Sequence, residues 1–281
     1  MSLEQTIADL VAASNNLTGT INTKMNEIDQ KVDQATESVP NTIRELSEQR
    51  LYVDSVNGSD TNDGSPGNPL KSLYKALSLH VSGSSTNIFL KEGQTFSETG
   101  FSPVVASGKI SVSRWGSTGG VSNPVVHHTP LYNAERELNE SYPFRVMSGS
   151  VLFGDIHFKI ENADNGHDID GNHGLFYTYR SDFSMGASGC SFDLKNRSLF
   201  GYARGHYTSV RAHFKACQIN IIEDTNGQAK IVNGTLANGD QPIILIGALG
   251  TSIPSGVSWS DLIPIKPDFS NILTSMDTAN L

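Results

Sequence analysis

A short motif, Leu-Phe-x-x-x-Arg, occurs twice in the sequence, 24 residues apart. The first copy ends at Arg180 and the second at Arg204, and aromatic or imidazole side chains surround both: Tyr177, Tyr179, Tyr202, His206 and Tyr207. Aromatic rings pack against the C–H groups of sugars, while Arg and His bind hydroxyl or carboxylate groups. The motif therefore indicates a glycan-binding surface. The alternative is that the tyrosines pack between repeats or subunits and that the arginines pair with Asp182 or Asp193.

A polar loop at residues 164–174 crowds three carboxylates and two histidines into eleven residues. Oxygen-rich loops of this kind bind calcium when a bidentate glutamate closes them at a fixed spacing. This loop has no such glutamate, and its histidines do not share a rigid element. We expect a solvated turn that projects from one corner of the fold and binds neither a metal nor a cofactor.

Paired carboxylates are the other chemistry to consider, because glycosidic bonds are cut by an acid and a second carboxylate about 5–10 Å apart. Five acidic residues are candidates for such a pair: Asp155, Glu161, Asp182, Asp193 and Glu223. No motif singles out any of them. Glu161 and Glu223 fall at equivalent outward positions of a repeat, where solvated charges are ordinary. An enzyme is therefore the weaker alternative, and we predict no catalytic residue.

Short repeated strands would position these residues. I-H-F-K-I-E-N at 156–162 aligns with C-S-F-D-L-K-N at 190–196 and with C-Q-I-N-I-I-E at 217–223. Alternate residues of a strand face the same side, so one apolar set should point into a core. That set is Ile156, Phe158, Ile160, Cys190, Phe192, Leu194, Cys217, Ile219 and Ile221.

A second strand family repeats at a similar interval. Its members begin at Leu152-Phe153, Leu175-Phe176 and Leu199-Phe200, and an earlier pair matches Ile88-x-Leu90 with Ile110-x-Val112. Two registers that both repeat at this length indicate a solenoid of stacked β-rungs. The alternative is an antiparallel β-sandwich, which also has short strands and glycine turns.

The first 46 or so residues have a helical period instead. Apolar or small residues recur at alternating steps of four and three, with one extra step of four between Ile21 and Met25. This is the heptad pattern of a coiled coil with one stutter, and its polar flanks leave a narrow apolar stripe. Pro40 should end the first helix near Val39 or begin a second one over 41–49. The predicted oligomerisation residues are Leu3, Ile7, Leu10, Leu17, Ile21, Met25, Ile28, Val32, Val39 and Leu46.

The composition excludes several classes of protein. With 20 Lys and Arg against 29 Asp and Glu, the formal charge of -9 disfavours nucleic acid as a partner. The sequence shows neither a signal peptide nor about 18 consecutive apolar residues, so we expect no membrane insertion and synthesis in a cytoplasm. Two cysteines cannot form a metal cage alone, and we interpret Cys190 and Cys217 as small buried apolar residues.

The segment at 53–77 reads V-D-x-x-N-G-S-D-x-N-D-G-S-x-x-x-P-x-K-S-L-x-K-A-L. It resembles the first segment of the right-handed parallel β-helix tailspikes and tail fibres of bacteriophages, in the wider pectate-lyase-like superfamily. The strands expected at 88–96, 110–117 and from Pro124 continue the likeness, which covers residues 51–126. The resemblance implies a homotrimer on the virion tail, bound to other tail or baseplate proteins through its amino-terminal region.

The sequence thus predicts a mainly β protein, a right-handed parallel β-helix preceded by an α-helical coiled coil. The expected parts are a stalk at 1–49, a β-helix body at 50–258 and a capping tail at 259–281. The expected function is attachment to a host-cell surface receptor, and the aromatic and arginine side chains of the repeated motif indicate a glycan. Two alternatives stay open: a polysaccharide depolymerase, and a structural connector that carries another receptor-binding protein.

Overall fold

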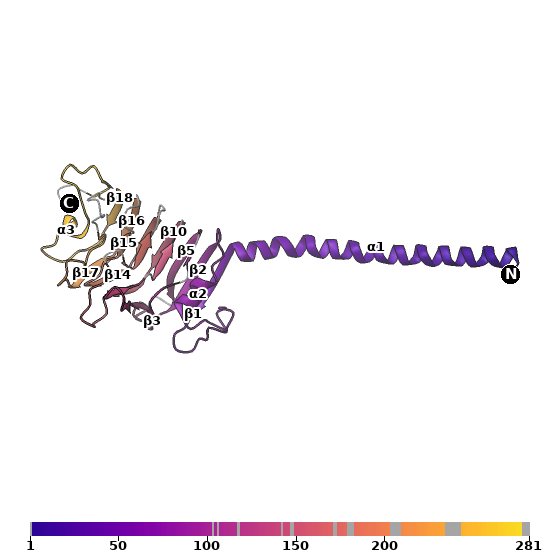
Figure 1. Ribbon diagram of the computed structural model, residues 1–281, viewed down its shortest axis with the longest axis horizontal. Helices are drawn as coiled ribbons and strands as arrows, with labels where there is room; N and C mark the ends of the chain where they lie inside the picture. The colour runs from indigo at the N-terminus through magenta and orange to yellow at the C-terminus, as the bar shows by residue number, and fades with distance from the viewer. Residues whose placement is uncertain are drawn as a thin grey trace. The chain divides into compact units, whose positions relative to one another are not determined.

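The computed structural model describes residues 2–102, 104–105, 107–116, 119–141, 143–146, 149–170, 173–178, 183–202, 209–233 and 243–276. The chain divides into two compact units, Met1–Leu46 and Ser47–Leu281. The first unit is one long helix, and the second, here called the body, is built mainly of β-strands (Figure 1).

Helix α1 spans Leu3–Ser47. Ser2 begins it, because its hydroxyl accepts a hydrogen bond from the backbone N–H of Gln5 at 3.3 Å. At 1.5 Å per residue the helix is about 68 Å long. The prediction that the helix breaks at Pro40 is wrong, since Pro40 lies inside it. A proline removes one helical hydrogen bond at a cost of about 3 kcal/mol, and the many bonds on either side offset that cost.

The described residues of the body form three parallel sheets. Sheet A has the strand order β1-β2-β5-β10-β13-β16-β18-β19, and every pairing in it is parallel. Figure 1 shows most of these strands side by side in chain order. Their bounds are Glu48–Val53, Ser85–Lys91, Lys109–Trp115, Gly149–Gly154, Phe183–Ser188, Ser209–Lys215, Ile243–Leu249 and Ile272–Thr274.

Sheets B and C have fewer strands, and every strand pairing in them is also parallel. Sheet B has the order β3-β6-β11-β14-β17, and sheet C has the order β4-β9-β12-β15. The strands of sheet B are Thr95–Thr99, Val125–Thr129, His157–Glu161, Ser191–Lys195 and Gln218–Glu223. Those of sheet C are Val104–Val105, Phe144–Val146, Phe176–Thr178 and Phe200–Tyr202.

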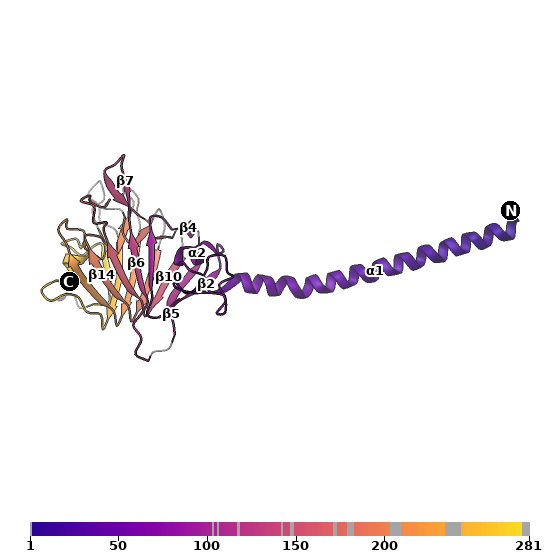
Figure 2. The same ribbon diagram turned by 90° about the horizontal axis from the view of Figure 1, so that it is seen from below.

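From β2 to β17 the chain visits sheets A, B and C in the same cyclic order. Each circuit adds one strand to each sheet, so the body is parallel β-helix-like. This confirms the predicted mainly β, solenoid-type architecture and excludes the antiparallel β-sandwich. One hairpin departs from the winding: β7 (Leu131–Asn133) pairs antiparallel with β8 (Leu138–Glu140) and stands out from the body (Figure 2).

Stacked aromatic rings fill the interior. In sheet B, Phe158 and Phe192 occupy register-matched positions, with ring centroids 5.2 Å apart and planes 5° apart. In sheet C, Phe144, Phe176 and Phe200 form a second ladder, with successive centroids 5.3 Å and 5.1 Å apart. All five rings are buried. Each contributes a few kcal/mol of hydrophobic stabilisation and ties one rung to the next.

The first strand family is confirmed, because Phe158 pairs with Phe192 and Phe192 with Ile219. Its predicted inward residues are buried, except Ile221, which is only partly buried. The second family is partly wrong. Leu152 lies in sheet A, whereas Phe176 pairs in sheet C with Phe144 on one side and Phe200 on the other.

The register predicted for Ile88-x-Leu90 and Ile110-x-Val112 is wrong by two residues. Ile88 pairs with Val112 rather than with Ile110, although both strands do lie side by side in sheet A. The shift arises because alternate positions of both strands are apolar and buried, so that two registers look equivalent in the sequence.

Helix α2, Leu73–Ser78, follows β1 and its turn cluster. Its N-cap is Ser72, and Leu70, Leu73, Ala76 and Leu77 are buried, as the apolar spacing of that segment indicates. The predicted carboxy-terminal tail supplies α3 (Trp259–Leu262) and β19, which adds a strand to sheet A beside β18. The predicted strand around Ile243 is β18.

Candidate functional site

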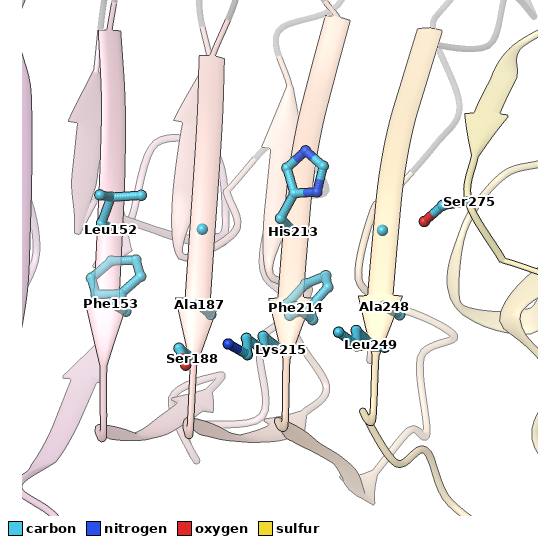
Figure 3. Close-up of a pocket in the computed structure, with 12 residues that line it drawn as sticks. Leu152, Phe153, Ala187, Ser188, His213, Phe214, Lys215, Ala248, Leu249 and Ser275 are labelled. Atoms are coloured by element: carbon cyan, nitrogen blue, oxygen red, sulfur yellow. The ribbon is translucent and has the colours of Figure 1, made fainter.

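The outer face of sheet A carries a hollow of about 490 Å³. It lies over β10, β13, β16 and β18 and extends to the segment that follows β19 (Figure 3). One outward row crosses it, because Leu152, Gly186, His213 and Gly247 are register partners on successive strands. Ser275 lines the far end. The volume is in the range of ordinary small-molecule pockets.

Two glycines make the hollow. A Cβ atom on Gly186 would lie 2.8 Å from Cδ2 of Leu152, and one on Gly247 would lie 2.9 Å from Nδ1 of His213. Because neither glycine has a side chain, the surface of the sheet is recessed beside Leu152 and His213. A second outward row, Ser188, Lys215 and Leu249, borders the hollow. The site therefore combines apolar walls with one imidazole, one ammonium group and two hydroxyls.

The outer face of sheet B is polar instead. Nε2 of His157 lies 2.7 Å from Oδ2 of Asp193, whose Oδ1 accepts a hydrogen bond from Asn220 at 2.7 Å. His127 and Glu161 form a second imidazole–carboxylate contact at 3.2 Å. The structure thus brings several predicted acidic candidates to one face, and each already has a partner. Glu223 follows the same pattern, since it lies 3.8 Å from Lys195.

The His157–Asp193 pair is half of the arrangement that activates a nucleophile. Ser191 is the register partner of His157 on the next strand. Among the described residues, no hydrogen bond from Ser191 to that imidazole completes a triad.

A buried polar cluster lies at the inner corner between sheets B and C. Its centre is Arg197, which is 0% exposed. Nη1 of Arg197 lies 3.1 Å from Nδ1 of His128, Nη2 donates to Gly174 O at 2.9 Å, and Nε donates to His173 O at 3.2 Å. Ser141 completes the group, since its Oγ contacts Nη2.

Burial determines the charge states in this cluster. It lowers the pKa of His128 well below its usual value and that of His173 to about 4, so both imidazoles are neutral at pH 7. It also lowers the pKa of Arg197 to about 9, which leaves the guanidinium protonated. The hydrogen-bond partners of Arg197 among the described residues are carbonyls, a hydroxyl and an imidazole, with no carboxylate.

Glu98 lies one strand from His128 in the same inward row of sheet B. Its Oε1 accepts hydrogen bonds from the backbone N–H groups of Leu73 at 2.7 Å and Tyr74 at 3.2 Å, at the start of α2. Burial raises the pKa of Glu98 to about 7. Glu98 and the Arg197 cluster hold backbone groups in place, and we interpret both as structural.

The prediction of a solvated turn at residues 164–174 is wrong for its second half. Asp170 and His173 are buried. Asp170 pairs with Arg136, and the Nδ1 atom of His173 accepts a hydrogen bond from Ser141 N at 3.1 Å. These contacts pull the segment onto the body, because a buried carboxylate is stable only with a charged or hydrogen-bonding partner. Among the described residues no group of three His, Cys, Asp or Glu is arranged to hold a metal ion.

The predicted glycan-binding side chains lie outside the described part of the structure. Backbone positions are described for Tyr177 in β12 and Tyr202 in β15, and these strands pair directly through Phe176 and Phe200. The Leu-Phe repeat therefore occupies adjacent rungs. The glycan-binding role itself stays a prediction for all seven residues: Tyr177, Tyr179, Arg180, Tyr202, Arg204, His206 and Tyr207.

The apolar stripe of α1 is exposed along its whole described length. Nine predicted oligomerisation side chains are between 49% and 76% exposed: Leu3, Ile7, Leu10, Leu17, Ile21, Met25, Ile28, Val32 and Val39. The tenth, Leu46, has a side chain outside the described part. None of the described helices combines the length and apolar character that a membrane-spanning segment needs. Cys190 and Cys217 are free and buried, as predicted.

Comparisons with protein-family models, with curated proteins and with solved structures found no match to this chain.

Proposed function

We propose that the chain is a bacteriophage tail fibre or short tailspike that attaches the virion to a surface receptor of its host. In this proposal three copies associate through α1 as a parallel coiled coil. Each copy carries a right-handed parallel β-helix, the hand that parallel crossover connections almost always have. The amino-terminal region contacts other tail or baseplate proteins, and the protein is located on the virion tail.

The exposed apolar stripe of α1 carries the proposal. Ile21 and Ile28, for example, are 49% and 58% exposed on a helix whose remaining positions are mainly polar. Burying an aliphatic side chain contributes about 1.5–3 kcal/mol, so a stripe of ten such positions strongly favours association with like helices. The trimer and the phage origin come from the sequence resemblance at residues 51–126, and the parallel β-helix-like body supports both.

Sedimentation of the full chain tests the association. The wild-type protein is expected to sediment with the mass of three chains, and the double variant Ile21→Asn/Ile28→Asn with the mass of one. Ala12→Asn/Gln30→Asn is the matched control, since both positions lie off the stripe. A monomeric wild-type protein, or a trimer that survives the stripe variant unchanged, would contradict the role of α1.

Attachment is tested with cells. Fluorescent full-length protein should bind to the surface of host bacteria in a panel of strains, with avidity from three linked bodies. A protein that binds no strain fits a structural connector instead. New reducing ends or unsaturated sugars after incubation with surface polysaccharide would support a depolymerase, for which Glu161, Asp193 and Glu223 on sheet B are the residues to replace.

A further inference from the structure

Sheet A has a charge opposite to that of the whole chain. In its eight strands the only carboxylate is Glu48, which lies 3.7 Å from Arg50. The same strands hold six cations: Arg50, Lys91, Lys109, Arg114, Arg211 and Lys215. The chain as a whole has 29 acidic and 20 basic residues. A basic sheet in an acidic protein indicates an anionic partner.

The cations nearest to the hollow have no ion-pair partner among the described residues. Lys215 lines it beside His213, and Arg211 lies two residues earlier on β16. Neither residue has an ion-pair partner in the described part of the structure. Arg114 shows the contrast, because it lies 3.5 Å from Asp155 in the turn after β10. The charges of Arg211 and Lys215 are therefore available to a ligand.

The shape of the hollow suits an extended ligand. Its central row runs from Leu152 on β10 to Ser275 beyond β19, across strands that are about 4.8 Å apart. The row is therefore about 19 Å long and runs along the stacking direction of the strands. Gly186 and Gly247 allow a ligand to approach the backbone, and Leu152 and Leu249 supply apolar contact on either side (Figure 3).

We propose that the outer face of sheet A binds an acidic polysaccharide. The apolar faces of the sugar rings would lie against Leu152 and Leu249, and their carboxylate or sulfate groups would face His213, Lys215 and Arg211. This proposal rests on the proposed attachment function and names the class of receptor. It also adds a site distinct from the surface predicted around Arg180 and Arg204.

Binding of labelled polymers to the full-length chain tests the charge requirement. The acidic probes are fluorescein-labelled polygalacturonate, alginate and hyaluronan, and the neutral probes are methyl-esterified polygalacturonate and dextran. At least one acidic polymer should bind at low salt, and its binding should weaken as salt rises, because salt screens exposed charges. Arg211→Glu/Lys215→Glu should weaken that binding at least about tenfold. The control Lys71→Glu/Lys159→Glu makes the same charge change away from the hollow and should bind as the wild type does.

A second variant tests the shape. Gly186→Leu places a side chain in the hollow, where its Cβ meets only the flexible tip of Leu152. It should abolish binding while the thermal unfolding temperature stays near that of the wild type. Gly67→Leu is the control, because nothing lies within 4 Å of its Cβ position.

Several results would overturn the proposal: no acidic polymer binds at low salt, the esterified polymer binds equally well, or the control variants lose as much binding. If Arg211→Glu/Lys215→Glu changes the sedimenting mass, the face is a contact between copies of the chain instead. Sedimentation in the same buffer separates failure of this proposal from failure of the proposed fibre. A monomer that still binds the polymer would retain the site and contradict the fibre.

Discussion

The guanidinium of Arg197 lies 3.1 Å from Nδ1 of His128, a residue 69 positions earlier in the chain. Nη1 can only donate, so Nδ1 must accept, and the proton of the neutral imidazole is on Nε2. Nε2 in turn donates to the carbonyl of Gly100 at 3.0 Å. These two contacts fix the tautomer of His128 and link three different circuits of the solenoid, at Gly100 after β3, His128 in β6 and Arg197 after β14.

Replacing Arg197 with Met should destabilise the body by about 3–5 kcal/mol. The substitution keeps the bulk of the side chain but leaves the carbonyls of His173 and Gly174 without their buried donor. Guanidinium chloride unfolding at a fixed protein concentration measures the change. Lys159→Met, on the outer face of sheet B, should change stability by less than about 0.5 kcal/mol. Equal stability of the two variants would show that the Arg197 cluster is dispensable.

Acid should destabilise the body through His173. Its pKa is about 4 in the folded protein, below the ordinary 6.5, because burial disfavours the charged ring. The stability that it contributes is therefore present above pH 6.5 and is lost as the pH falls to 4. Glu98 has the opposite effect on stability. Burial raises its pKa to about 7, so the stability that it contributes is present below pH 4.5 and is lost as the pH rises to 7.

The variant His173→Gln separates these two effects. Glutamine can still accept the hydrogen bond from Ser141 N, but it does not titrate. Between pH 4 and 6.5 its stability should depend on pH less steeply than that of the wild type, by up to about 1.4 kcal/mol per pH unit. Unfolding curves at pH 7.5, 5.5 and 4 measure the slope. An identical slope in both proteins would mean that His173 is not the titrating group.

The sequence predicts the sheets better than it predicts the corner between them. Phe158 and Phe192 lie in strands with a strict alternation of apolar residues, so their register follows from the period of two. Leu152-Phe153 and Leu175-Phe176 look alike in sequence but belong to different sheets. In the first pair only Phe153 is buried, whereas at the second both side chains are buried. The Leu-Phe pair alone does not show which sheet its strand belongs to.

Arg197 could not be recognised from its sequence context. An arginine between Asn196 and Ser198, just after a strand, is typical of an exposed turn. Its burial depends on carbonyls at His128, His173 and Gly174, which only the closed winding brings together. Glu98 offered more of a signal, because it occupies an inward position in the alternation of β3. The hollow on sheet A depends on the register of Gly186 with Gly247, which the irregular spacing of the later rungs conceals.

The aromatic ladder should dominate the stability of the body. Phe192 is fully buried, stacks on Phe158 and contacts Phe214 edge-on at 5.8 Å. Phe192→Ala leaves a cavity in a rigid stack and should cost about 3–5 kcal/mol. Ile222→Ala, at a side chain that is 56% exposed, is the control and should have little effect. The difference between the denaturation midpoints of the two variants measures the contribution of the aromatic ladder to stability. Equal midpoints would contradict that contribution.

The surface predicted from the sequence around Arg180 and Arg204 can be tested independently of sheet A. The Leu-Phe parts of the two motif copies occupy adjacent rungs, since Phe176 pairs with Phe200. Replacing both arginines with Ala should reduce binding of the full-length protein to host cells, because each can form charge-assisted hydrogen bonds to a glycan. The sedimenting mass and unfolding temperature should stay unchanged. Comparison with Arg211→Glu/Lys215→Glu then assigns the receptor: loss only in the alanine variant assigns adhesion to the repeated motif, and loss only in the glutamate variant assigns it to sheet A. Wild-type adhesion by the alanine variant would contradict the motif-based prediction.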